Sequence, residues 1–204
     1  MTNNAKNDII NTDNNQGFDA ENMEKVKKRR KNGMTTITDI KPIDFNDEAA
    51  IMKEIDDFIK KYAYSDVEHA FEISPNGNAY KLTGIKGEVH SEIIGKDALK
   101  GSISIHNHPV EIGKNKGDSF SPEDLKFAAE NNLGKQYLIS GNRRNAFEFM
   151  KYYTRDEIES AWDKARAVMW ERHIENETTV IFEHEDVLRE LNLFMKEFKF
   201  YENF

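Results

Sequence analysis

The chain has 204 residues, 38% of them hydrophobic, and a formal net charge of −8, which is enough for one globular domain with a buried core. It contains no cysteine, which excludes disulfides and thiolate metal sites and suits a reducing compartment. No apolar run is long enough to cross a bilayer, and the first residues lack the apolar core of a signal peptide. We therefore expect a cytoplasmic protein without a membrane partner.

Residues 1–34 differ in composition from the rest of the chain. Asn and Asp dominate up to Gly17 without hydrophobic periodicity, which predicts a disordered tail. A basic run begins at Lys25 and ends at Lys31. It could contact nucleic acid, but no aromatic residue is interleaved for base stacking, which favours a solvated linker. The remaining chain carries 22 basic and 32 acidic residues, a balance that argues against a DNA-binding body.

The first predicted elements are a helix and a β-hairpin. From Asp47, apolar residues recur at helical spacing on one face, which we expect to pack on a sheet. Strands are predicted at 67–73 and 78–83 around a Ser-Pro-Asn-Gly turn. Residues 88–94 fit a strand or a loop, and 96–100 a short connection.

The hairpin and the segment after it carry several acidic residues. Glu68 lies at the start of its first strand, and Glu72 lies on the same strand face. Glu88 and Glu92 are further acids upstream of the histidine-rich strand described next. By alternation His69 points away from Glu68, so we expect it in the core or on the surface. Alone, Glu68 would be interpreted as an exposed acid at a strand end.

A second strand leads into a pair of histidines. Residues 102–105 alternate small polar and β-branched side chains, which predicts a buried strand that continues into His106-Asn107-His108-Pro109. Because successive strand side chains point to opposite faces, both imidazoles leave the same face. Pro109 ends the strand, since it has no N–H to pair. The spacing offers two ligands to one metal ion, although such a pair alone is more often a surface feature.

A third ligand is predicted at the start of the next helix. Ser121 has the features of an N-cap, followed by Pro122 at the first helical position and Asp124 in the first turn. By itself this is only a capping box. With the histidines it gives two imidazoles, one carboxylate and an open position, the usual inventory of a catalytic zinc site. We therefore predict one Zn²⁺ per chain, bound by His106, His108 and Asp124.

A further hairpin is predicted downstream, with strands at 136–140 and 146–150. Arg143 and Arg144 fall in its turn. We expect them to be solvated charges at the hairpin tip. In the less favoured interpretation they contact an acidic tail of a substrate.

The C-terminal third predicts two helices. The first runs from about 154 to 173, after a capping box, and the second from about 187 to 198, after a break near 176–181. The aromatic residues Phe200, Tyr201 and Phe204 are expected to dock on the core. The charged residues around His184 are expected to form a solvated first turn, not a metal cluster.

In this order the motifs resemble the signature of the JAB/MPN+ metalloproteases, also called the JAMM family. That signature is a Glu on an earlier strand, then His-x-His-Pro, then Ser-x-x-Asp. Asn107 between the histidines makes the chain most similar to the RadC-like and phage-associated JAB domains. The resemblance covers about residues 47–150. The loop from Pro109 to Phe120 is longer than is usual in the family, which leaves open which loop closes over the site.

The resemblance implies a single α/β JAMM domain, a mixed β-sheet flanked by helices, over residues 35–150. The disordered polar and basic tail, 1–34, precedes it, and a helical C-terminal extension, 151–204, follows. The resemblance also implies zinc-dependent hydrolysis of a peptide or isopeptide bond, as in deubiquitinases, in a protein or peptide substrate. Glu68 would be the general base and Ser121 would stabilise the oxyanion, with Glu72 as the alternative base.

A second class of function stays open. JAB-like segments also resemble parts of phage minor head or tail-associated proteins, and some JAB/MPN domains are scaffolds without metal. The complete set of five site residues favours the hydrolase, because scaffolds usually lack one or more. The two interpretations place the protein in the cytoplasm of a bacterial host cell or on a phage particle with a structural partner. An HNH nuclease is disfavoured, because those enzymes spread their residues over a ββα unit.

Overall fold

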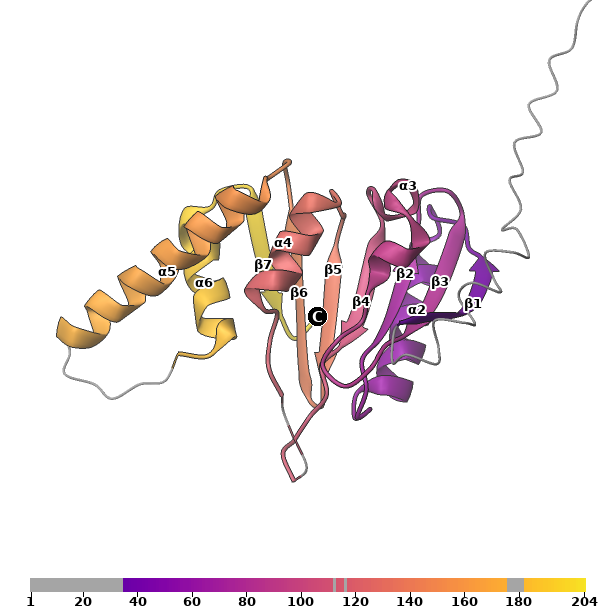
Figure 1. The fold of residues 1–204 in the computed structure, drawn as a ribbon, viewed down its shortest axis with the longest axis horizontal. Helices are drawn as coiled ribbons and strands as arrows, with labels where there is room; N and C mark the ends of the chain where they lie inside the picture. The colour runs from indigo at the N-terminus through magenta and orange to yellow at the C-terminus, as the bar shows by residue number, and fades with distance from the viewer. Residues whose placement is uncertain (1–34, 112, 116, 176–181) are drawn as a thin grey trace, which may run out of the picture.

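The computed structural model describes residues 35–111, 113–115, 117–175 and 182–204. Within them, seven strands form one mixed sheet in the order β1-β3-β2-β4-β5-β6-β7, and helices lie on both of its faces (Figure 1). Strands β4 and β5 pair in parallel, and the other neighbouring strands of this sheet pair antiparallel. The predicted α/β class is confirmed. The expected tail, 1–34, and the expected break near 176–181 lie outside the described residues.

The elements follow the predicted order through the first two thirds of the chain. Their bounds are β1 (Thr36–Pro42), α2 (Glu48–Tyr62), β2 (His69–Ile73), β3 (Asn78–Thr83), the 3-10 helix η2 (Ser91–Ile94), α3 (Lys96–Leu99), β4 (Ile103–Asn107), α4 (Pro122–Glu130), β5 (Gln136–Ser140), β6 (Arg143–Phe149), α5 (Arg155–Glu175), α6 (His184–Phe194) and β7 (Phe198–Glu202). The edge strand β1 was not predicted. None of the described helices is long and apolar enough to span a membrane.

Alternation along the strands divides the core into two clusters, one on each face of the sheet. On one face Phe71 and Ile105 pack against Ile55 of α2. On the other face Leu138 joins Leu125 of α4, together with residues of α3, α5 and α6. Because neighbouring residues of a strand take opposite faces, His106 lies on the same face as α4. The sheet therefore brings the histidine motif and the capped helix together.

The predicted course of the C-terminal third was partly wrong. Helix α6 ends at Phe194, and the last residues form β7, which pairs with the edge of β6. The apolar spacing up to Phe198 fits a helix, but a strand there satisfies the backbone groups that β6 would otherwise expose. The prediction that the aromatic end docks on the core is confirmed, since the rings of Phe204 and Tyr137 lie 4.7 Å apart and Phe200 packs on the opposite face.

Of the two arginines predicted to be solvated at the tip of the second hairpin, Arg144 is exposed as predicted but Arg143 is not. Arg143 is 4% exposed, and its guanidinium lies 2.5 Å from a Glu183 oxygen and 3.0 Å from a Glu185 oxygen. The expected solvated first turn of α6 is only partly right, because Glu183 is exposed but Glu185 is buried. The turn of the second hairpin and the start of α6 meet in space, and an arginine that is buried there needs carboxylate partners.

Candidate metal centre

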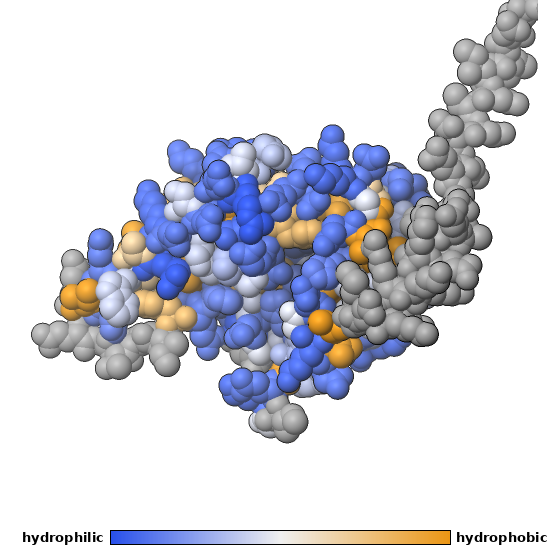
Figure 2. Space-filling model, viewed as in Figure 1, coloured by the Kyte–Doolittle hydropathy of each residue, from blue (hydrophilic) through white to orange (hydrophobic). Residues whose placement is uncertain are grey.

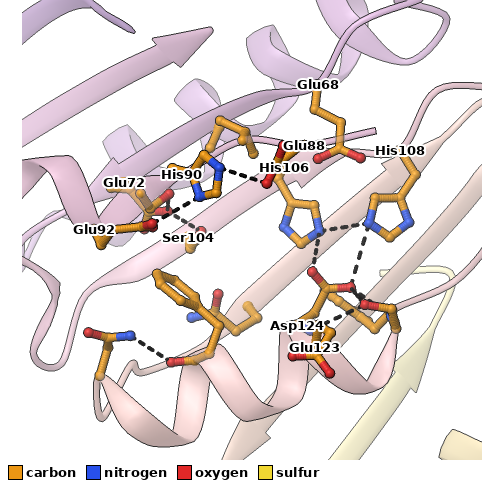
Figure 3. A pocket seen from close by; sticks show the side chains of 18 of the residues that line it. Glu68, Glu72, Glu88, His90, Glu92, Ser104, His106, His108, Glu123 and Asp124 are labelled. Carbon is orange, nitrogen blue, oxygen red and sulfur yellow. Dashed lines mark hydrogen bonds and ion pairs between the residues drawn. The ribbon is translucent and has the colours of Figure 1, made fainter. Parts of the chain in front are cut away.

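Three side chains converge on the α4 face of the sheet. His106 and His108 come from the end of β4, and Asp124 comes from the first turn of α4 (Figure 3). The Nε2 atoms of the two imidazoles are 3.2 Å apart, and each lies 3.5 Å from one oxygen of Asp124. One ligand atom from each residue lies within 4.8 Å of the others. This group could bind a metal ion, and it contains the three residues that the sequence predicted.

The start of α4 fixes the orientation of the carboxylate. The backbone N–H of Ser121 donates to Asp124 Oδ2 at 2.7 Å, and the Ser121 hydroxyl donates to the same oxygen at 2.8 Å. In return the Asp124 N–H donates to Ser121 Oγ at 3.3 Å. Oδ1 is left to face His106 Nε2. The capping box therefore does more than start a helix, because it orients the carboxylate with Oδ1 toward His106 and Oδ2 toward His108.

The protonation states suit metal binding. Burial lowers the pKa of His106 to about 4, which keeps the imidazole neutral, and the neutral ring is the form that ligates. Burial raises the pKa of Asp124, but His106, His108 and the Ser121 hydrogen bonds outweigh it, so the pKa is below its usual range. At neutral pH both groups are therefore ready to donate an electron pair.

Glu68 lies beside this group, one residue before β2. It is 9% exposed, lines the same cavity as the three candidate ligands, and directs its carboxylate toward the imidazoles (Figure 3). Burial, then the negative charges of Asp124 and Glu88, raise its pKa to about 8, against an opposing hydrogen bond from the Val89 backbone. A carboxyl group with a pKa near neutrality, next to a potential metal site, has the properties of a proton-transfer group.

Asn107, between the two histidines, holds the backbone on both sides of Glu68. Its Oδ1 accepts from the His69 N–H at 2.8 Å, and its Nδ2 donates to the Val67 carbonyl at 3.0 Å. The side chain is fully buried. Asn107 therefore ties the segment that carries the acid to the strand that carries the imidazoles. In the sequence Asn107 is notable only for the family resemblance, because its contact with the backbone around Glu68 depends on how β2 pairs with β4.

The other candidate residues lie outside the three-residue group. Glu72 lies further along β2, where it accepts hydrogen bonds from Ser91 and Ser104. Glu88 and Glu92 both bind the ring of His90 at the cavity edge. His69 stacks on Tyr62, with ring centroids 4.0 Å apart, and faces away from the centre as predicted.

The stability of the protein should depend on the charge of Glu72. Burial raises its pKa from 4.5 to about 7, although Ser91, Ser104 and Ser102 favour the charged form. The folded state therefore holds a proton that the unfolded state releases, so stability falls as the pH rises from about 4.5 to about 7. The predicted loss is about 3 kcal/mol, from 1.36 kcal/mol per unit. Urea unfolding of the wild type and Glu72→Gln over this range measures it: the advantage of the wild type should shrink by this amount, and a constant difference would contradict it.

The long loop after Pro109 is held against the turn between β5 and β6. The Asn142 N–H donates to the Asn115 carbonyl at 2.8 Å. At the end of the loop Phe120 is fully buried, with its ring 5.6 Å from that of His106. The loop therefore contacts His106 of the candidate centre through Phe120, while Asn115 is bound to the neighbouring turn.

No family model matches the chain, and neither a curated protein nor a solved structure matches it. What points to a function is the chemistry of the centre, where two imidazoles, a carboxylate held by a helix cap, and a second acid of raised pKa line one cavity.

Proposed function

We propose that the protein is a zinc-dependent hydrolase of JAMM type that cleaves a peptide or isopeptide bond in a protein or peptide substrate. The observation that carries the proposal is the convergence of His106, His108 and Asp124, with Glu68 at the edge of the group. Two imidazoles and one carboxylate are a usual ligand set of catalytic zinc, which keeps a fourth position for water or substrate.

The spacing of the ligand atoms supports zinc. Tetrahedral zinc with bonds of ~2.0–2.1 Å separates neighbouring ligand atoms by ~3.3 Å. The separation between the two Nε2 atoms is 3.2 Å, and that between His106 Nε2 and Asp124 Oδ1 is 3.5 Å. Hard cations such as Ca²⁺ and Mg²⁺ prefer more oxygen ligands than the single carboxylate of this group offers.

In the proposed mechanism the bound metal, Glu68 and Ser121 have different roles. Zinc supplies a Lewis acid and lowers the pKa of a water. Glu68 in its charged form accepts a proton from the attacking water and passes it to the leaving amine, and its raised pKa of about 8 helps it to hold the proton between the two steps. Ser121 keeps its hydroxyl on Asp124 and so positions that ligand. This assignment differs from the oxyanion role implied by the resemblance, because the hydroxyl proton is already donated to Asp124.

The test of the proposal is metal content followed by a substrate screen. We expect about one zinc per chain in the wild type by elemental analysis, in line with a single three-residue site, and a loss of zinc in His106→Ala and Asp124→Ala. The zinc-loaded wild type should then hydrolyse members of a peptide and isopeptide pool, read by mass spectrometry. A wild type that binds no zinc after zinc is added would refute the proposal and favour the phage-type structural protein.

Ser121→Ala should weaken zinc binding more than it weakens the fold. Loss of the cap costs about 1 kcal/mol, and loss of an orienting partner lowers metal affinity by about 10- to 100-fold. Thr154→Ala is the matched control, because Thr154 and Glu157 form the same kind of cap at the start of α5 and neither of them lines the cavity. Competition with a zinc chelator measures affinity, and thermal unfolding measures stability. Equal zinc affinities in the two variants would contradict this role of Ser121.

A further inference from the structure

A second polar group lies in the floor of the same cavity, next to the candidate metal centre. Glu72 of β2 is opposite Ser104 of β4, which is in turn paired with Gln136 of β5. All three line the cavity, and each is at most 4% exposed. We refer to Glu72, Ser104 and Gln136 as the polar row.

The polar row contains hydrogen-bonding atoms without partners. Oε1 of Glu72 accepts from the Ser91 and Ser104 hydroxyls at 2.5 and 2.9 Å. The Ser102 hydroxyl also favours the charged form of this carboxylate, but the buried Oε2 makes no hydrogen bond of ordinary length to the described residues. Nor does Nε2 of Gln136. Burying such atoms without a partner costs about 1–3 kcal/mol each. Two buried polar atoms without hydrogen bonds in one cavity floor are better explained by binding of a ligand than by a structural role. Apolar side chains at these two positions would stabilise the fold more.

The polar row lies at a fixed distance from the metal centre. Along the sheet the next row is Ala70, His106 and Leu138. Two residues of strand separate the rows, which is ~7 Å. Ala70 is small, so the floor between the two groups is not blocked by a large side chain on β2. A substrate chain bound at the centre can therefore send a long side chain along β2 and β4 to Glu72.

The charge of the cavity favours a cation there. The cavity has a volume of about 1240 Å³. Among the described residues, eight acidic residues but only three Lys or Arg line it. Of those three, Arg155 is already paired with Glu123 and Glu130. No cation contributes to the shifted pKa of Glu72. Hydrophilic side chains also predominate on the face that carries α3 and α4, which border the cavity (Figure 2).

We propose that the polar row is a specificity subsite for a positively charged side chain, lysine or arginine, of the substrate that is cleaved at the metal centre. The cationic nitrogen donates to Glu72 Oε2, and the carboxamide of Gln136 closes the other side of the subsite. The role as a substrate subsite rests on the proposed hydrolase function. Binding of the cation does not, because it needs neither zinc nor a reaction.

The test is NMR titration of the ¹⁵N-labelled full chain with two small probes. Nα-acetyl-lysine methylamide carries the ammonium, and Nα-acetyl-norleucine methylamide has a similar apolar stem without it. We expect saturable shifts at the amides of Glu72, Ser104 and Gln136 with the lysine probe and none with the norleucine probe. In Glu72→Gln the affinity for the lysine probe should fall at least about tenfold, as for loss of one charge-assisted hydrogen bond.

Control variants separate the subsite from general acidity and from folding. Glu92→Gln removes an acid at the cavity edge that is paired with His90, and it should leave lysine affinity nearly unchanged. Gln136→Met tests the other side of the row and serves in place of Glu72→Gln if that variant unfolds; it should also weaken binding. Equal binding of the two probes, full lysine affinity in Glu72→Gln, or equal losses in Glu72→Gln and Glu92→Gln would overturn the subsite.

The two proposals fail in different ways. Lysine binding that depends on Glu72, in a protein that takes up no zinc and cleaves nothing, would refute the hydrolase and retain the cation site. Hydrolysis that is indifferent to lysine or arginine near the cleaved bond would support the hydrolase and refute the subsite. The titration is therefore made on metal-free and on zinc-loaded protein.

Discussion

Glu68→Gln is expected to lower kcat by about 10²- to 10⁴-fold, the range for loss of a general base. The substitution keeps the shape of the side chain but removes its ability to accept a proton. Zinc content should stay at the wild-type value, because Glu68 is outside the group formed by His106, His108 and Asp124. The measurement is the initial rate on the best peptide from the substrate screen, with zinc determined on the same sample.

Glu72→Gln is the matched control for this variant. Glu72 is the other buried acid on the same face of β2, one row beyond Ala70, and it was the alternative base. If Glu68 is the base, Glu72→Gln changes substrate preference but keeps activity on the substrates it still binds. A larger fall in kcat for Glu72→Gln than for Glu68→Gln would reverse the assignment. Loss of zinc in Glu68→Gln would instead make Glu68 a ligand.

Asn107→Ala is expected to lower both stability and activity. The substitution leaves the Val67 carbonyl and the His69 N–H without their partner in a buried place, which costs about 3 kcal/mol for two hydrogen bonds. For a chain of this size the melting temperature should fall by about 6–12 °C. Release of the backbone around Glu68 should also lower kcat by about 100-fold, the effect of a displacement of ~1 Å.

Asn145→Ala provides the comparison for Asn107→Ala. Asn145 is 1% exposed and accepts a hydrogen bond from the Ser119 hydroxyl, at a distance from Glu68 along the sheet. It should lower the melting temperature but leave the pH dependence of kcat unchanged. In Asn107→Ala that pH dependence should shift, because the surroundings of Glu68 change. If both variants lose activity only in proportion to their stability, Asn107 has a structural role alone.

The parts of the candidate centre that sequence analysis predicted are local in the chain. His106 and His108 share a face because a strand alternates, and Asp124 is held because Ser121 caps a helix, and both rules act over a few residues. The role of Asn107 was missed because it depends on the register between β2 and β4, which no local rule supplies.

The errors in the fold have the same origin. Leu191, Phe194 and Phe198 fit a helical period, yet the vacant edge of β6 makes the end of the chain a strand. Arg143 was assigned to solvent because it lies next to a turn, and its burial follows only from the approach of α6. Local periodicity therefore predicted most helices and strands and the three candidate ligands. The edge strand β7 and the buried ion pair of Arg143 depend instead on contacts between segments that are distant in the sequence.

The three candidate ligands lie close together in the sequence, whereas Glu68, the proposed base, lies far from them. This difference bears on the order in which the parts of the centre assemble during folding. The three candidate ligands come from the strand, loop and helix between His106 and Asp124, so bringing them together closes a short loop and loses little chain entropy. Glu68 joins them only when β2 pairs with β4 and Asn107 engages its backbone. If the protein is the proposed zinc hydrolase, a chain folded around β4, β5 and α4 alone would hold the three ligands together without the base. We would then expect metal binding to precede catalytic competence, and an incompletely folded chain to be inactive until β2 pairs with β4.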